Sequence, residues 1–502
     1  MSIATELQDL NDNIKAAYNK VSSLQGDVPA DKNMVNLPAA IDTVRQYDIH
    51  LKYTNSQGAT LYRGDPIART VNEPFLPPNV ATIDQRALAY AYDGMSQYSS
   101  AERRGTNFEN IVRIGISGMS HAFTNYYGDG MFIFRGSVKD INFNSLAEVS
   151  SYGLNYAYAY NEVEAINFPE LVTASYNSFE SAFYESSAAG ATASFPKLKT
   201  VGSSAFKNTF ASPNGNTKGL VSADFSGLEK IDGAYDAFSG AFRGNKQLAS
   251  VDFSSLWSVK GNGAFNNAFY GCLALTDTSC FRGLKEVIGS SSTGEFRDCF
   301  NSSGLQTVNF PELTTATTIA GVFYNAFRSC TSLTTASFPK LAAAPSQCFS
   351  NAFYDDTALT SFSAPLMQSA GSSSFSYAFY NCTSLTTVSL TSLASVEYRC
   401  FDYAFRGCTS LTSISFPALS AINSYNSNSC FSSAFSGCSA LTSVSFPAVT
   451  ASSFATNYAL SSLLSGTSGV TLHFPAGTES AVQVLIGYPN FGGTNTTVLF
   501  DL

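Results

Sequence analysis

Charged residues are scarce in this chain of 502 residues, making up 13% of it, about half the share found in ordinary soluble proteins. The formal net charge of −9 is spread thinly, and no run of Lys or Arg occurs. Nucleic acids are bound through clustered basic side chains, so we expect no nucleic-acid partner. No stretch reaches the roughly 18 apolar residues that span a bilayer. The first residues also lack the pattern of a secretory signal, so we expect neither membrane insertion nor a signal peptide.

Groups that commonly carry catalysis are few as well. The only histidines are His50, His121 and His473, which stand far apart and in no metal-ligand spacing. The stretches GISGMS and GNGAFNNAF match neither a nucleophile elbow nor a dinucleotide-binding loop. We therefore predict that the protein is not an enzyme and has no catalytic residues, metal site or cofactor.

The main feature of the chain is an internal repeat. A short apolar or β-branched stretch ends in one inward residue thirteen times, at intervals of 25 to 30 residues. These strand-end positions are Phe143, Phe168, Phe195, Phe225, Phe253, Cys280, Phe310, Phe338, Ala364, Leu390, Phe416, Phe446 and Phe474. An Ala-Phe pair keeps step with them, as at Ala352-Phe353 and Ala434-Phe435. A fixed period of this length predicts a solenoid, in which each coil buries its apolar edge against its neighbours.

The best-formed coil, residues 435–449, predicts the structure of the unit. Leu441, Val444 and Phe446 point inward while the alternate serines point outward, and Pro447 ends the strand. Phe431 and Phe435 have the four-residue spacing of a helical turn. We therefore predict an α/β repeat, a solenoid with one short parallel strand per coil of about 26–30 residues and a helical turn opposite it.

The ten cysteines follow the repeat rather than forming a disulfide framework. Cys382, Cys408 and Cys438, among others, lie three residues after the phenylalanine of an Ala-Phe pair. Each thus takes an inward position as a small apolar residue, and parallel side chains in a stack are poorly placed for a disulfide dihedral. We expect buried thiols.

The recurring pattern AF-xx-C-xx-L-T-x-V-x-F-P-x-L resembles the BspA-like leucine-rich repeat of bacterial surface proteins, over about residues 110–475. This resemblance implies a curved leucine-rich-repeat solenoid that binds proteins or glycans. Insertions near Gly190, Asn214 and Thr293 depart from the pattern, and the N-terminal copies lack the Cys.

The N-terminal segment carries an apolar seam with alternating spacings of four and three residues, over Ile3, Leu7, Leu10, Ile14, Ala17, Val21 and Leu24. Three heptads suit an oligomerisation helix, which would make the protein a homo-oligomer. A hairpin within one chain, covered by a second helix around Leu37–Val44, explains the seam equally well. The segment also resembles the attachment segments of bacteriophage tail and other virion appendage proteins.

We divide the chain into four parts: a helical attachment or oligomerisation segment (1–45), a β element with a Pro-containing connector (46–109), the solenoid (110–475) and a C-terminal cap (476–502). The cap is expected to be a short helix and a final strand. It would cover the open end of the solenoid, where unpaired strand edges are exposed.

The outward positions of the predicted strands are the candidate binding site. They form a ladder of short hydroxyl and amide side chains: Thr307, Asn309, Thr335, Ser337, Ser361, Ser363, Thr387, Ser389, Ser413, Ser415, Ser443 and Ser445. We expect one uninterrupted surface, flanked by tyrosines such as Tyr354 and Tyr380, that hydrogen-bonds sugars or peptide backbone. Asp224 and Asp252 take corresponding outward positions, where a solvated face is favoured over a cation site.

Two functions fit these features. The leading hypothesis is a virion appendage, such as a phage tail fibre, head fibre or receptor-binding protein, which binds a host-surface glycan or protein and other virion proteins through its N-terminal segment. Its location would be the virion, assembled in the host cytoplasm. The alternative is a bacterial or protist cell-surface adhesin of the BspA-like type.

Overall fold

The computed structural model describes residues 53–55, 60–61, 80–83, 106–107, 112–120, 140–186, 189–214, 219–289, 294–317, 321–423, 430–453, 460, 462–486 and 493–502. The chain divides into two compact units, residues 1–188 and 189–502, and each is described by itself. The predicted segment 1–45 and its heptad seam lie outside the described residues. None of the helices in the described ranges is long and apolar enough to cross a bilayer.

The first unit contains two rows of short parallel strands. Strand β1 pairs antiparallel with β2 and β3, and parallel pairing then joins β3, β5, β7 and β9 in one row and β4, β6 and β8 in the other. Their bounds are β1 (Tyr53–Asn55), β2 (Thr60–Leu61), β3 (Val80–Ile83), β4 (Thr106–Asn107), β5 (Arg113–Ile114), β6 (Asp140–Asn142), β7 (Glu148–Val149), β8 (Ala165–Asn167) and β9 (Thr173–Ala174).

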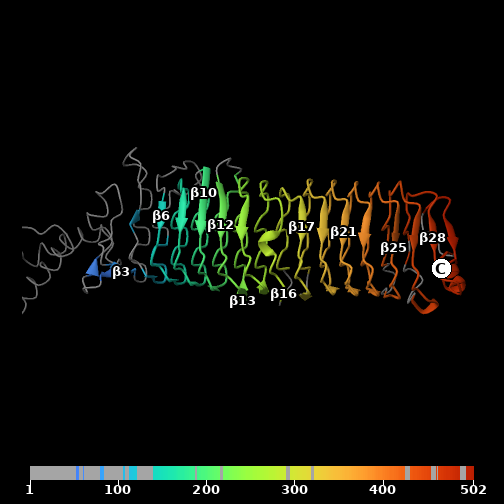
Figure 1. Ribbon diagram of the computed structural model, residues 1–502, viewed down its shortest axis with the longest axis horizontal. Helices are drawn as coiled ribbons and strands as arrows, with labels where there is room; N and C mark the ends of the chain where they lie inside the picture. Colours follow the sequence, from blue (N-terminus) through green and yellow to red (C-terminus); the bar gives the residue numbers. More distant parts are fainter. Residues whose placement is uncertain are drawn as a thin grey trace, which may run out of the picture. The chain divides into compact units, whose positions relative to one another are not determined.

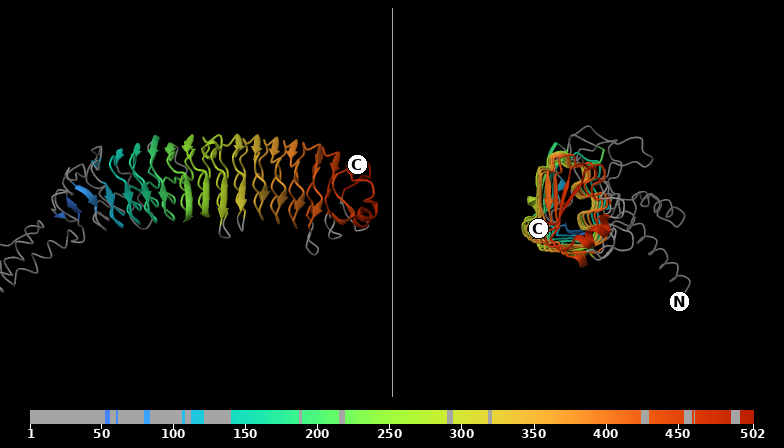
Figure 2. Two further views of the ribbon diagram at one scale, coloured as in Figure 1. Left: turned by 60° about the horizontal axis from the view of Figure 1, so that its bottom comes forward. Right: turned by 90° about the vertical axis from the view of Figure 1, so that its right-hand side faces the viewer.

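The second unit also has two strand rows, whose coils lie one behind another (Figures 1 and 2). The first strand row comprises β10 (Ala189–Ser194), β12 (Gly219–Asp224), β14 (Ser250–Asp252), β17 (Thr307–Asn309), β19 (Thr335–Ser337), β21 (Ser361–Ser363), β23 (Thr387–Ser389), β25 (Ser413–Ser415), β27 (Ser443–Ser445), β28 (Thr471–His473) and β29 (Thr497–Leu499). The second strand row comprises β11 (Thr200–Val201), β13 (Lys230–Tyr235), β15 (Ser258–Asn262), β16 (Glu286–Gly289), β18 (Thr315–Thr317), β20 (Ala343–Ala344), β22 (Ser369–Ala370), β24 (Ser395–Val396) and β26 (Ala421–Ile422).

Each regular coil therefore contains two short strands, and the expectation of one strand per coil is wrong. After β19 the chain turns at Phe338, whose carbonyl accepts a hydrogen bond from the Leu341 N–H at 3.3 Å, and then enters β20. Strand β20 pairs in parallel with β22 of the next coil. In the regular coils the second-row strands β20, β22, β24 and β26 have only two residues each, which is too short to show an alternating pattern in the sequence.

The third side of each coil consists of turns rather than the helical turn that the four-residue spacing suggests. Positive φ angles recur at every fourth residue, 56° at Gln347, 54° at Asn351 and 63° at Asp355. Between them, alternate N–H groups donate to the next coil, as from Phe349 to the Ser374 carbonyl at 2.7 Å. A helix keeps its N–H bonds within itself. This side is a hydrogen-bonded stack of turns whose period of four imitates a helix, so the predicted helical turn is wrong.

Stacked aromatic rings form the core, as the repeat predicts. All thirteen predicted strand-end residues are buried, and ring pairs such as Phe195–Phe225 and Phe225–Phe253 stack with centroids 5.0 and 5.1 Å apart. One assignment is wrong: Phe281, not Cys280, stacks on Phe253 at 5.6 Å and continues the column. Each such pair contributes about 0.5–1.5 kcal/mol beyond the burial of its area.

All ten cysteines are buried and free, so the predicted burial is confirmed. The thiols at the position after Ala-Phe donate to a carbonyl of the preceding coil: Cys382 to Phe353 at 3.0 Å and Cys408 to Phe379 at 3.1 Å. Burial raises the pKa of the Cys400 and Cys438 thiols to about 12. The column is therefore an apolar part of the core and not a reactive site.

The tail contains the short helix α4 (Glu479–Ile486), preceded by the 3-10 turn η3 (Ala451–Ser453), and ends in β29, which pairs in parallel with β28. Among the described residues α4 is the only α-helix. A capping role for this tail stays a prediction, as do the boundaries at residues 45, 109 and 475.

Candidate ligand-binding face

The twelve predicted site residues occupy the outward positions of the first strand row. Parallel pairing aligns Thr307, Thr335, Ser361 and Thr387 in one line across four coils. Parallel pairing also aligns a second line of four side chains beside the first: Asn309, Ser337, Ser363 and Ser389. The inward residue of each strand is buried in all but β23, where Val388 is half-buried. The register thus brings eight of the twelve residues together on one sheet.

The remaining four, on β25 and β27, belong to a separate sheet formed by β25, β27, β28 and β29. The twelve side chains therefore do not lie on one continuous hydrogen-bonded sheet, because β23 and β25 are not paired. The break coincides with Leu390, which takes a strand-end position otherwise held mostly by Phe, and with the half-buried Val388.

Most of these side chains keep their hydrogen-bonding groups available. In the described part of the chain, only Ser415 and Ser445 among the twelve bond through their side chains, with 2.8 Å between the two Oγ atoms. A neighbouring line of threonines differs: Thr360 Oγ1 donates to the Thr334 carbonyl at 2.9 Å, and Thr386 to Thr360 at 3.1 Å. The threonine line fastens coil to coil, whereas the strand hydroxyls remain free to bind a ligand.

The tyrosines predicted to flank the strand face lie in the turns that form the third side of each coil. Tyr354 and Tyr380 stack with ring centroids 4.5 Å apart, and the Arg328 guanidinium lies 4.5 Å from the Tyr354 centroid. Tyr377 and Tyr403 stack at 4.9 Å. Their ring faces are occupied by each other and by arginine, so these tyrosines mainly stabilise the stack.

A cavity of about 490 Å³ opens in the first strand row between β10 and the 3-10 turn η2 (Ser279–Phe281). Sequence reasoning missed its cause, a single extra residue. Leu248 and Phe253 are five residues apart, but Leu275 and Phe281 are six apart. Phe281 keeps its place in the core, so the surplus residue disrupts the strand and leaves η2 in its place. The six-residue interval was the signal that could have revealed it.

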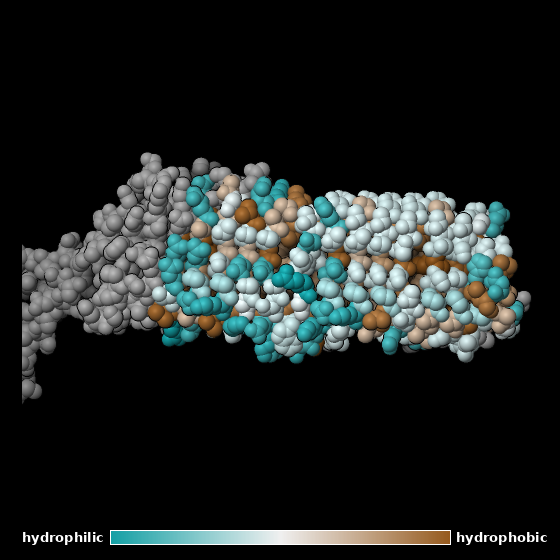
Figure 3. Space-filling model, viewed as in Figure 1, coloured by the Kyte–Doolittle hydropathy of each residue, from teal (hydrophilic) through white to brown (hydrophobic). Residues whose placement is uncertain are grey.

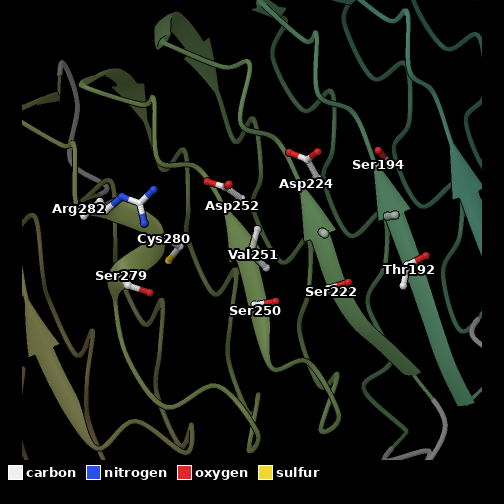
Figure 4. A pocket seen from close by; sticks show the side chains of 12 residues that line it. Thr192, Ser194, Ser222, Asp224, Ser250, Val251, Asp252, Ser279, Cys280 and Arg282 are labelled. Atoms are coloured by element: carbon white, nitrogen blue, oxygen red, sulfur yellow. The ribbon is translucent and has the colours of Figure 1, made fainter.

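The lining side chains form three rows across four coils (Figure 4). One row consists of Thr192, Ser222, Ser250 and Ser279, and a second of Ser194, Asp224, Asp252 and Arg282; between them lie Ala193, Ala223, Val251 and Cys280. The predicted alignment of Asp224 with Asp252 is confirmed by the pairing of β12 with β14. They border a cavity rather than the plain solvated face that was favoured.

Within the described ranges, neither the one histidine placed there nor any cluster of metal-ligating residues forms a further candidate site. His473 Nδ1 lies 3.0 Å from Asp501 Oδ1, while His50 and His121 lie outside the described residues. In the described ranges, no group of three or more His, Cys, Asp or Glu residues could hold a metal ion.

A comparison with protein families matches the chain to the BspA type leucine rich repeat region, in six copies. The matched segments are residues 117–214, 236–349, 266–376, 296–430 and 351–465, which together exceed half of the chain. No curated protein matches.

Among solved structures, the mouse RP105/MD-1 complex aligns at 13% identity over 81% of this chain and 84% of that one, with a TM-score of 0.19. The plant peptide hormone receptor RGFR1 in complex with RGF2 aligns at 11% identity over 90% and 79%, with a TM-score of 0.14. These low scores carry no argument. On the family match, the chain belongs to the BspA type leucine-rich repeat family.

Proposed function

We propose that this protein is a surface-binding repeat protein of the adhesin type, which recognises a protein or glycan on another cell through its first strand row. The observation that carries this proposal is the register of β17, β19, β21 and β23, which lines up eight short polar side chains over four coils. Family membership supports it, because repeat solenoids use extended surfaces of this kind for binding.

The chemistry of the row suits a polar, uncharged partner. Hydroxyl groups exchange hydrogen bonds with water for bonds with sugars or peptide groups, and little charge is desolvated. Strands β19 and β21 are paired on both sides and rest on a buried core, so their outward groups are ordered before binding and lose little entropy. In Figure 3 pale residues line both sides of a hydrophobic stripe along this part of the molecule, whereas strongly hydrophilic residues gather nearer β13 and β16.

The virion-appendage hypothesis has less support. It depends on residues 1–45, which lie outside the described residues, and the family match concerns the repeat alone. Attachment to other virion proteins and homo-oligomerisation through the heptad seam stay predictions. Locating the protein by antibody labelling, on cell surfaces or in purified particles, separates the two functions.

The test of the binding face uses the full chain, labelled with a fluorophore, and cells or an array of surface glycans. The variant combines Thr335→Ala, Ser361→Ala and Thr387→Ala, and should lose most of the binding. The control combines Ser369→Ala and Ser395→Ala on the second strand row of the same coils and should bind normally. Unchanged binding by the triple variant would place the site elsewhere on the protein.

A further inference from the structure

The cavity beside η2 combines chemistry that the regular coils lack. Its volume of about 490 Å³ falls within the roughly 300–1,000 Å³ of small-ligand pockets. Carboxylate, guanidinium and hydroxyl groups line it together, while the first strand row from β17 to β23 offers only hydroxyl and amide groups.

Asp224 and Asp252 are held in fixed orientations at the cavity. Each accepts a hydrogen bond at Oδ1 from the backbone N–H two residues further on, from Ser226 at 2.9 Å and from Ser254 at 2.8 Å. In the described parts of the chain no hydrogen bond engages Oδ2 of either residue. Strand pairing sets the residues side by side, about 4.8 Å apart. Two ordered acceptors at this separation lose little side-chain entropy when a ligand binds.

Arg282 completes the row on the far side of Asp252 (Figure 4). It follows η2 directly, and its backbone N–H bonds to the Ser279 carbonyl at 3.1 Å. Among the described residues no carboxylate lies within ion-pair distance of its guanidinium. Its side-chain N–H groups are therefore free to donate to oxygen atoms of a ligand.

The floor between the two polar rows is the backbone of the strands. Ala193, Ala223 and Val251 take the inward positions of β10, β12 and β14 and are only 3%, 4% and 5% exposed, because their side chains face the core. A ligand in the cavity thus meets backbone beneath it and polar side chains along both sides. A saccharide unit suits such a site, because hydroxyl groups surround its ring and can bond to both rows.

The charged side chains of the cavity favour neutral sugars over acidic ones. Two carboxylates and one guanidinium give the walls a net negative charge, which repels an acidic sugar and favours hydroxyl donors. We infer that the cavity binds one uncharged saccharide unit of a surface glycan: Asp224 and Asp252 accept hydrogen bonds from its hydroxyl groups, and Arg282 donates to its oxygens. This inference rests on the proposed function, since it assigns a ligand class to the same strand row.

The test titrates the full chain with methyl glycosides of mannose, glucose, galactose and N-acetylglucosamine, followed by saturation-transfer NMR and calorimetry. Methyl glucuronide serves as the charged comparison. At least one neutral glycoside should bind, and the glucuronide should bind at least tenfold more weakly. Asp224→Asn with Asp252→Asn should weaken binding tenfold or more while preserving the shape of both side chains. Asp232→Asn, on exposed β13 of the second strand row, is the matched control and should bind as the wild type does.

A second variant tests the cavity by filling it, with no change of charge. Ser222→Trp should fill the cavity and abolish glycoside binding, whereas Ser361→Trp, at an equivalent outward strand position, should not. No binding of any glycoside, or binding that both cavity variants retain, overturns the inference, as does preferential binding of Ca²⁺ or of a lysine peptide. If cell binding is lost in Ser361→Trp but not in Ser222→Trp, this inference fails while the proposed function stands.

Discussion

Two regions of the second unit, residues 219–289 and residues 321–416, share one core and differ on their outside. The aromatic columns run through both, with Phe238 stacked on Phe265 at 5.4 Å in the first and Phe349 stacked on Phe375 at 5.2 Å in the second. Outside, the second strand row of the first region carries ion pairs and its first strand row borders η2 and the cavity, while the first strand row of the second region carries hydroxyls at a strict period of 26 residues. The repeat therefore fixes the inward positions and leaves the outward ones free to acquire binding chemistry.

The largest effect should come from breaking the shared core. Phe265→Ala and Phe349→Ala each remove a fully buried ring that stacks on both neighbouring coils. Each should lower the free energy of unfolding by about 3–5 kcal/mol, measured by denaturant unfolding with circular dichroism. A much smaller loss at Phe265 than at Phe349 would show that the cavity region has a looser core, contrary to this account.

The buried acid Glu295, which lies between the two regions, gives the next largest effect on stability. Glu295 is fully buried, and burial raises the pKa of its carboxyl to about 7, although Oε2 accepts the Ala264 N–H at 2.9 Å. Because the folded pKa exceeds the unfolded one, stability falls as pH rises from about 4.5 to 7 and stays low above that. Glu295→Gln should therefore stabilise the protein by up to roughly 3 kcal/mol at pH 8 and by little at pH 4.

The control for that titration is Glu312→Gln, which removes an exposed carboxylate that pairs with Lys340 at 2.8 Å. Thermal unfolding at the two pH values is the measurement. An equal shift of Tm at pH 4 and pH 8 for Glu295→Gln would mean that its effect is not the burial of charge.

Deleting Cys280 should give this coil of the first region the regular strand that the coils of the second region have. The deletion changes LTDTSCF to LTDTSF, which has the spacing of LTTASF at residues 333–338. Without the surplus residue a strand should form between β14 and β17 and close the cavity. Stability should change by about 1 kcal/mol or less, since Phe281 keeps its place. Hydrogen exchange of residues 275–281 should slow, and persistent fast exchange would show that η2 has another cause.

The smallest effect on stability should come from the surface charges on the second strand row of the first region. Lys260 pairs with Glu286 at 3.2 Å, and both side chains are partly exposed to solvent. Lys260→Gln should change the free energy of unfolding by less than about 1 kcal/mol, because exposed ion pairs are weak and screened by salt. A larger loss, measured by denaturant unfolding at low and high salt, would give these charges a structural role.

The sequence predicts what the repeat makes periodic. Buried positions such as Phe338 and Leu441 recur once per coil, so their burial and the outward register of Ser361 follow directly. The second strand row does not follow, because strands such as β20 have two residues. The turns do not follow either, since left-handed residues at every fourth position, such as Ser373 and Tyr377, give the same spacing as a helix.

The periodic repeat also made part of the candidate site predictable. The alignment of Asp224 with Asp252 follows from the period, but the cavity depends on how one extra residue is accommodated. Because the stacking of Phe281 on Phe253 fixes the core, the surplus residue is accommodated in the preceding strand, which is replaced by η2. The break between β23 and β25 has no counterpart in the spacing, which is 26 residues from Leu390 to Phe416 as in the coils before it.

The central claim is that recognition takes place on the first strand row and not on the second. One pair of variants in a single coil tests it most directly: Ser361→Trp on β21 and Ser369→Trp on β22, compared for binding to cells. Both residues point outward on short strands, so both variants should fold as the wild type does. The account predicts at least a tenfold loss for Ser361→Trp and normal binding for Ser369→Trp, and the reverse result would contradict it.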